Sequence, residues 1–411
     1  MVNTDRYVVD RSSYDSLCSH YLLQQANDET ISYREQKKRR HLSFLLHGFE
    51  IDRKKVLNQS KRTVSPTQFL RTLGKLPRKV KAKPERILEA PSIINDFYTS
   101  GLDWGYHDTL AVALDTSVYT WNTKTNKTQL LVEYPTYDNA YISCVAWKPR
   151  TTDLAVTNTC TEYIDLWHEQ EERLIQKLRT HMHQVIAMCW NGNLLSCGTI
   201  GGNILHYDVR THSDYPTAIT REGDVVCGLK WSPNGRYLAS GSNNTVKIWD
   251  FRQLDAKRPL VNNQCHLSAV KAIAWCPWEP TLLATGGGIC DQTVRLWNSM
   301  NGKEKCHVKT DSQVTSILWS EQYRELVTSH GKQDCSLKMW EYPRLHLIEE
   351  LKIHQERILS AVLSPDQTCV AAASADETIS IWNCFPRDKK RKARQVGSGS
   401  SLEFAMFNTI R

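Results

Sequence analysis

The sequence predicts an all-β fold, a propeller of seven four-stranded blades, on two observations: a strand pattern and its recurrence. The clearest copy of the pattern is residues 225–250, where two short runs of alternating apolar residues flank the turn Ser232–Gly235. Alternation with a period of two, interrupted by Pro and Gly, is typical of antiparallel strands. A third run, Val246–Trp249, is followed by Asp250, and a Trp-Asp pair at this point is the signature of a WD40 propeller blade.

The second observation is that aromatic residues recur in two interleaved series, at roughly the 40- to 48-residue spacing of such blades. One series falls in the third run of each repeat: Trp121, Trp167, Tyr207, Trp249, Trp297, Trp340 and Trp382. The other is offset from it: Trp104, Trp147, Trp190, Trp231, Trp275 and Trp319, with Leu363 in the seventh place. Together the two series contain every tryptophan except Trp278, which argues against aromatic residues scattered through an ordinary core. Because seven blades close a ring, the first and last sheets must meet.

The repeat divides the chain into three regions. Residues 1–94 are polar and contain no tryptophan, so we expect an arm that is largely disordered when alone. Residues 95–385 are the predicted propeller, preceded by Pro84–Pro91, whose two prolines favour an extended path. Residues 386–411 are a predicted flexible tail with a basic run and a Gly/Ser linker. No apolar stretch approaches the ~20 residues that span a bilayer, and the polar N-terminus indicates no secretory signal.

The net charge of +8 is distributed unevenly. Residues 1–95 hold 19 Lys/Arg against 10 Asp/Glu, residues 385–411 hold 7 against 2, and the remainder holds 26 against 32. A mildly acidic ring therefore carries two basic extensions, which bears on partners rather than on fold.

Two segments of the arm stand out as candidate sites. Asp5–Arg11 mixes apolar and charged residues, and Tyr14, Leu17, Tyr21 and Leu22 then recur at the spacing of a short amphipathic helix that needs a partner groove. Ser65 precedes a proline in a flexible stretch and is a candidate site of proline-directed phosphorylation. At the other end, Ile410-Arg411 offers a free carboxylate that a groove could bind, the alternative being a frayed terminus.

Nothing in the sequence indicates an enzyme, a cofactor or a metal site. The phosphate-binding Gly-x-x-x-x-Gly-Lys loop, the Gly-x-Gly-x-x-Gly loop between a strand and a helix, and the His-Glu-x-x-His motif are all absent. His181 and His183 are close together without an evident third ligand, and isolated histidines of this kind are usually structural. The 13 cysteines are odd in number and scattered, which suits reduced thiols. An acidic ring without a stacking platform also disfavours nucleic acid, so binding of short peptides is the expected use.

Several motifs resemble those of the Fizzy family, the WD40 co-activators of the anaphase-promoting ubiquitin ligase. Asp5–Arg11 with Ser12 resembles the C box, which docks on the ligase core, and Pro84–Tyr98 resembles the lead-in to the first blade. Val225–Trp231, Ala269–Trp278 and Ala375–Thr378 are similar to blade signatures, and Ile410-Arg411 matches the Ile-Arg tail that binds a helical-repeat subunit. The resemblance runs from residue 5 to residue 411, and both ends with seven blades between them make a strong joint signal.

The resemblance implies where partners bind. It assigns destruction-box binding to Asp96 and Glu377, which ring closure would make neighbours, and KEN-box binding to Asp103, Asn243, Gln313 and Arg357. It assigns ligase docking to Asp5, Arg6, Tyr7, Arg11, Ile410 and Arg411. The implied partners are subunits of the anaphase-promoting complex and degron-bearing substrates such as cyclins, with no membrane, nucleic acid or cofactor, in cytoplasm and nucleus.

Three departures from the family pattern suggest a divergent member, with a mitotic or a meiotic role. Val9 stands where the C box usually has proline, and Asn58 stands where a second docking motif has arginine, so docking is expected to be weaker or different. Ile289 replaces a threonine at a peptide-contact position, which removes a polar contact. The function implied is a substrate-recruiting activator of the ligase; the alternative is a propeller scaffold that no longer activates it.

Overall fold

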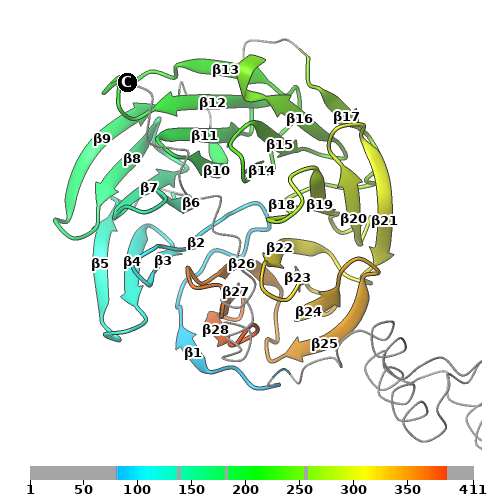
Figure 1. The fold of residues 1–411 in the computed structure, drawn as a ribbon. Coiled ribbons are helices and arrows are strands. Elements are labelled where there is room, and N and C mark those ends of the chain that lie inside the picture. Colours follow the sequence, from blue (N-terminus) through cyan, green and yellow to red (C-terminus); the bar gives the residue numbers. More distant parts are fainter. Residues whose placement is uncertain (1–79, 81, 137–139, 181–183, 254–257, 387–411) are drawn as a thin grey trace, which may run out of the picture. The chain divides into compact units, whose positions relative to one another are not determined.

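The computed structural model describes residues 80, 82–136, 140–180, 184–253 and 258–386. Within this part of the chain, 28 strands form seven four-stranded sheets, the blades of a propeller (Figure 1). The helical content of the described residues is one short 3₁₀ turn, η3 (Phe251–Gln253), and no helix there is long and apolar enough to cross a membrane. The predicted all-β, seven-bladed fold is therefore confirmed.

Within each blade we name the strands a to d from the centre outward. The first three blades are β2 (Leu102–Trp104), β3 (Thr109–Leu114), β4 (Ser117–Asn122), β5 (Thr128–Glu133); β6 (Ile142–Trp147), β7 (Asp153–Asn158), β8 (Tyr163–His168), β9 (Arg173–Arg179); and β10 (Val185–Asn191), β11 (Leu194–Thr199), β12 (Asn203–Asp208), β13 (Ala218–Arg221).

The remaining four blades complete the propeller. They are β14 (Gly228–Trp231), β15 (Tyr237–Gly241), β16 (Val246–Asp250), β17 (Val261–Asn263); β18 (Ala272–Trp275), β19 (Leu282–Gly286), β20 (Thr293–Asn298), β21 (Lys303–Lys309); β22 (Val314–Ser320), β23 (Glu325–His330), β24 (Ser336–Glu341), β25 (His346–Lys352); and β26 (Ile358–Leu363), β27 (Val370–Ser374), β28 (Thr378–Trp382), β1 (Arg86–Glu89). Residues 339–350 are the end of β24, a turn closed by a Leu345 N–H to Glu341 carbonyl hydrogen bond of 2.8 Å, and the start of β25.

Ring closure is made by the N-terminal strand β1. It pairs antiparallel with β28, with Glu89 opposite Thr378 and Arg86 opposite Ile381, and so supplies strand d of the seventh blade. The innermost strands β2 and β26 are neighbours, which closes the ring between the first and last blades. The extended path predicted for Pro84–Pro91 is therefore confirmed, and the propeller's first strand lies ahead of the predicted start at residue 95.

The two tryptophan series fall on strands a and c, and each has its own role. Strand-a indoles donate across to the neighbouring blade, as Trp190 does to the Ala146 carbonyl (3.2 Å) and Trp275 to the Lys230 carbonyl (3.0 Å). Trp319 donates likewise to the Ala274 carbonyl (3.2 Å), whereas the indole N–H groups of Trp104 and Trp147 have no hydrogen-bond partner among the described residues. Leu363, at this position in the seventh blade, has no side-chain N–H and cannot make the bond.

In the fifth and seventh blades, the strand-c tryptophan belongs to a buried polar network inside its own blade. In the seventh blade, His354 bonds Asp376 (3.0 Å) and the Ser380 hydroxyl (2.6 Å), which also accepts from the Trp382 indole (2.8 Å). The fifth blade repeats the arrangement with its own residues: His266, Asp291, Thr285 and Trp297. His354 and His266 thus have structural roles, whereas His181 and His183 lie outside the described residues.

Candidate functional site

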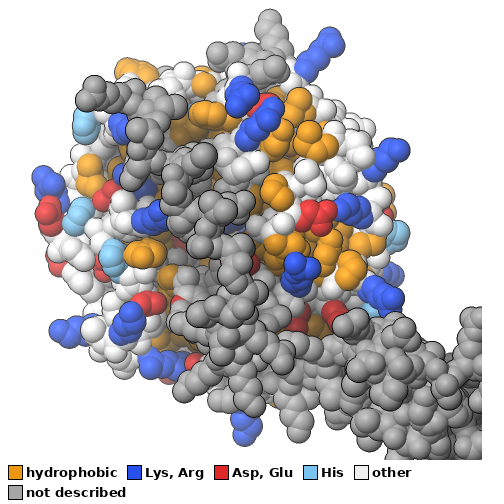
Figure 2. Space-filling view, in the orientation of Figure 1, with side chains coloured by type: hydrophobic (Ala, Val, Ile, Leu, Met, Phe, Trp, Pro, Cys, Tyr) orange, Lys and Arg blue, Asp and Glu red, His pale blue; other side chains and the backbone are white. Residues whose placement is uncertain are grey.

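One face of the propeller carries nearly all of the predicted peptide-binding residues. Because successive strands run antiparallel, the turns between strands b and c and the connections from strand d to the next strand a lie on the same face. We call this the connector face. Five predicted residues lie on it: Asp96 (β1–β2), Asn243 (β15–β16), Gln313 (β21–β22), Arg357 (β25–β26) and Glu377 (β27–β28). Among the described residues visible in Figure 2, basic side chains are scattered between acidic, polar and hydrophobic ones.

The seam between the last and first blades brings Glu377 to the connection that carries Asp96. A Glu377 carboxylate oxygen accepts the Ser92 N–H at 3.1 Å, and the Glu377 carbonyl accepts the Ala90 N–H at 2.8 Å. Glu377 has a φ of 61°, so its backbone is in the left-handed region, and its side chain is exposed. Asp96 lies four residues beyond Ser92 in the same connection. Ring closure therefore assembles the seam from the first connection and the last blade of the propeller.

Asp96 is held in place and remains partly exposed. One of its carboxylate oxygens accepts the Tyr98 N–H at 3.1 Å, and its carbonyl accepts the Thr99 hydroxyl at 2.9 Å. Burial raises the pKa of Tyr141 on the neighbouring blade, and the negative charge of Asp96 raises it further. Asp96 is thus a fixed acidic group at the seam, with lone pairs left to accept hydrogen bonds from a ligand.

Arg357 is tied to the same seam through Asn95, a residue that the sequence did not single out. Its Nε donates to the Asn95 side-chain oxygen, and its Nη2 donates to the Asn95 carbonyl. These two residues are 262 positions apart, so no local pattern could have paired them. The predicted KEN-box residue Arg357 therefore neighbours the predicted destruction-box residue Asp96 on the connector face.

Asn243 and Gln313 lie on the blades on either side of the fifth. Asn243 is exposed in a turn closed by a Ser242 N–H to Thr245 carbonyl hydrogen bond of 3.0 Å. Gln313 is half-buried and packs closely against Gly331. A Cβ added at Gly331 would lie only 3.0 Å from the Cβ of Gln313. Between these blades Ile289 is 58% exposed in the β19–β20 loop. The departure noted in the sequence is therefore a surface apolar residue.

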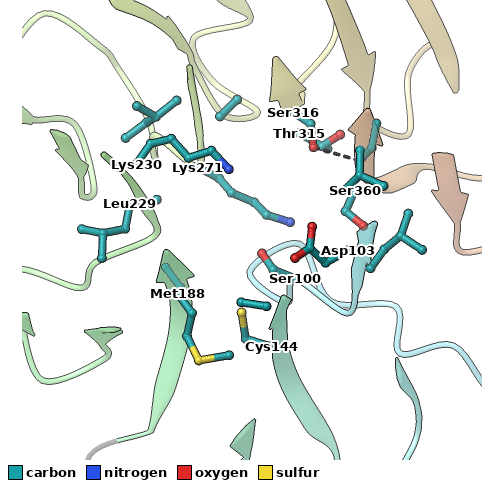
Figure 3. Close-up of a pocket in the computed structure, with 18 of the residues that line it drawn as sticks. Ser100, Asp103, Cys144, Met188, Leu229, Lys230, Lys271, Thr315, Ser316 and Ser360 are labelled. Carbon is teal, nitrogen blue, oxygen red and sulfur yellow. Dashed lines mark hydrogen bonds between the residues drawn. The ribbon is translucent and has the colours of Figure 1, made fainter. Parts of the chain in front are cut away.

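Asp103 occupies a different setting, the wall of the central channel (Figure 3). One carboxylate oxygen accepts the Trp147 N–H at 2.7 Å and the other accepts the Trp104 N–H at 2.9 Å. Burial raises the pKa of this carboxyl group. Asp103 thus lies in strand β2, not in a loop of the connector face, and both of its oxygens already bond backbone amides.

Dispersed metal-ligand residues and several buried thiols characterise the described part of the chain. No cluster of three or more His, Cys, Asp or Glu suited to a metal ion occurs in that part of the chain. Burial raises the pKa of the Cys144 and Cys189 thiols to about 12, so these sulfurs are poor nucleophiles at neutral pH. The predicted ligase-docking and phosphorylation residues lie outside the described residues: Asp5, Arg6, Tyr7, Arg11, Ser65, Ile410 and Arg411.

The fold and the connector face define a WD40 propeller whose loops carry acidic, amide and guanidinium groups on one face. The CDC20/Fizzy WD40 domain matches residues 88–382, and the chain belongs to this family. It is 40% identical to the anaphase-promoting complex subunit cdc20 of Dictyostelium discoideum, covering 84% of this chain and 70% of that protein.

Two further likenesses agree with the family. The chain is 34% identical to cell division cycle 20.5, cofactor of APC complex, of Arabidopsis thaliana, over 100% of this chain and 94% of that protein. It also matches a chain in a crystal structure of the mitotic checkpoint complex with a TM-score of 0.71 and 35% identity, covering 76% of this chain and 95% of the other.

Proposed function

We propose that this protein is a substrate-recruiting activator of the anaphase-promoting complex, and that it binds destruction-box and KEN-box degrons of cell-cycle proteins on its connector face. The observation that carries the proposal is the seam, where Glu377 of the last blade bonds the connection that holds Asp96. The names of the relatives, a subunit and a cofactor of that complex, supply the partner. The protein acts as an adaptor in cytoplasm and nucleus, and the catalytic step belongs to other subunits.

The seam has the chemistry to bind the arginine of an Arg-x-x-Leu destruction box. A guanidinium presents a planar fork of donors, which a carboxylate accepts bidentately. Asp96 and Glu377 supply two carboxylates from opposite ends of the propeller. Because the seam is partly exposed, we expect a moderate contribution: a charged hydrogen bond contributes roughly 1.5–3 kcal/mol, or about 10- to 150-fold in affinity.

A KEN box would bind elsewhere on the same face. Its lysine, glutamate and asparagine need acceptors, a cation and amide partners, respectively. Asn243 in the β15–β16 turn and Gln313 in the β21–β22 connection offer amides, and Arg357 offers the cation. Asp103 would contribute through the channel wall, where its bonds to two backbone amides leave it fewer free lone pairs.

Peptide titration on the purified protein tests the assignment. The double variant Asp96→Ala with Glu377→Ala should abolish binding of an Arg-x-x-Leu peptide and leave a KEN peptide nearly unaffected. Glu171→Ala is the matched control, because Glu171 is an exposed acid in a turn between strands c and d, on the opposite face. If the double variant binds the Arg-x-x-Leu peptide as well as the parent, the site assignment is wrong.

Activation is separated from scaffolding by co-purification with ligase subunits. Two weak anchors at the chain ends would act together, since tethering two sites raises avidity by ~10²–10⁴. Deleting Ile410-Arg411, or changing Arg6 and Arg11 to alanine, should each sharply reduce association with the ligase. Unchanged association after removal of both ends would leave the scaffold alternative.

A further inference from the structure

A buried lysine crosses the central channel and reaches the seam from the far side of the ring. Lys271 lies just before β18 in the fifth blade and is only 8% exposed (Figure 3). Its ammonium donates to the Thr99 carbonyl at 2.7 Å and to the Leu359 carbonyl at 2.9 Å. Thr99 belongs to the β1–β2 connection and Leu359 to β26. One side chain thus links the fifth blade to the first and the seventh.

The same connection is anchored by an aromatic residue beside this lysine. Phe97 is buried in a cluster with Cys227 and Ala269, which precede β14 and β18. The Lys271 ammonium lies 5.5 Å from the Phe97 ring centroid, within the range of a cation–π interaction. We call Phe97, Cys227, Ala269 and Lys271 the plug. Phe97 directly follows Asp96, and Thr99 lies two residues further on. The plug therefore fixes the backbone next to the Asp96 carboxylate.

The two carbonyl contacts differ in what else supports them. Leu359 lies inside β26, whose residues on either side pair with β27, so the strand keeps its position without Lys271. Residues 90–99 belong to no strand, and the next pairing is the bridge between Ser100 and Cys144. Loss of the lysine should therefore loosen residues 96–99 far more than β26, while Asn95 keeps its bonds to Arg357 on the N-terminal side of Asp96.

We propose that Lys271 is a positioning residue for the Arg-x-x-Leu subsite: it holds residues 96–99 across the channel so that Asp96 meets the peptide arginine. This inference rests on the proposed function. Charge-assisted hydrogen bonds to two carbonyls in a buried site are strong and directional, which suits a fixed carboxylate. Without these hydrogen bonds Asp96 is free to move, and binding the peptide must then order it again, which lowers the affinity.

The test compares Lys271→Met with Lys230→Met, a second lysine that lines the channel cavity of about 180 Å³. Methionine keeps the apolar stem of lysine and removes its donors. We expect Lys271→Met to bind an Arg-x-x-Leu peptide about 10-fold or more weakly, as for loss of a charged hydrogen bond. A KEN peptide should change less than about threefold, and Lys230→Met should bind both peptides like the parent. Hydrogen exchange in residues 94–102 should accelerate in Lys271→Met.

Two results would overturn the inference: unchanged Arg-x-x-Leu binding by Lys271→Met, or equal losses for both peptides, which would indicate general destabilisation. Should Lys271→Met fail to fold, Phe97→Leu loosens the plug from its other side and should give the same selective loss. Failure of the parent protein to bind the Arg-x-x-Leu peptide would instead overturn the proposed function, and the inference with it.

Discussion

Changing Lys271 to methionine should alter how the stability of the propeller depends on pH. Burial lowers the pKa of Lys271 from its ordinary 10.5 to about 8. Below pH 8 the folded and unfolded chains both hold the proton, so the full cost of burying the charge is present. Between pH 8 and 10.5 the folded protein releases the proton while the unfolded chain keeps it, so the free energy of unfolding rises with pH.

The size of this effect follows from the shift itself. At about 1.4 kcal/mol for each tenfold change in the proton dissociation constant, the parent should gain about 3 kcal/mol relative to Lys271→Met across the window. Near Lys271 lie the titratable or charged groups of Cys144, Asp96, Arg357 and Cys227. Burial raises the pKa of both thiols to about 12, so they stay protonated in the folded protein across the window.

Urea unfolding, followed by tryptophan fluorescence with a reductant present, measures this difference at pH 7, 8.5 and 10. Subtracting the variant from the parent cancels the other titrating groups. The free energy of unfolding of the parent should increase relative to that of Lys271→Met as pH rises, whatever the difference between them at pH 7. A difference that stays constant to within about 0.5 kcal/mol would refute the buried-charge argument, since such a change is close to the error of extrapolation.

Three further substitutions test other parts of the structure. Arg86→Ala should lower the free energy of unfolding in urea by about 1 kcal/mol, because the guanidinium carbon lies 5.5 Å from the centroid of the Trp121 ring, across the contact between the last and first blades. An unchanged free energy of unfolding would exclude a stabilising cation–π interaction there. His354→Ala should cost about 2–3 kcal/mol, because the half-buried Asp376 and the buried Ser380 hydroxyl each lose a hydrogen-bond partner; thermal unfolding at the parent's temperature would contradict this. Ile289→Thr should strengthen KEN-peptide binding about two- to fivefold by adding a hydrogen bond, and unchanged affinity in titration would argue against contact there.

The blades could be predicted from the sequence because each repeats the same local chemistry. The strand-a tryptophans Trp190, Trp275 and Trp319 each donate to a carbonyl of the preceding blade, so the same residue type recurs at the blade spacing. The closing strand β1 was harder to recognise, since its four residues are mostly exposed and show no apolar alternation. The bonds from Arg357 to Asn95 and from Lys271 to Thr99 join irregular connections far apart in sequence, and no periodic signal marks them.

Closure of the ring by β1 affects how the protein folds during its synthesis. During synthesis β1 leaves the ribosome long before its partner, because Glu89 and its opposite residue Thr378 are 289 positions apart (378 − 89). Until β28 emerges, β1 has no ladder and β27 is an open edge, and unpaired edges are templates for aggregation. Such late, distant pairing is also intrinsically slow. A chain that ends before residue 378 would therefore retain six complete blades but leave β1 and β27 unpaired at the seam. We expect chaperones to bind such a chain because its open strand edges promote aggregation.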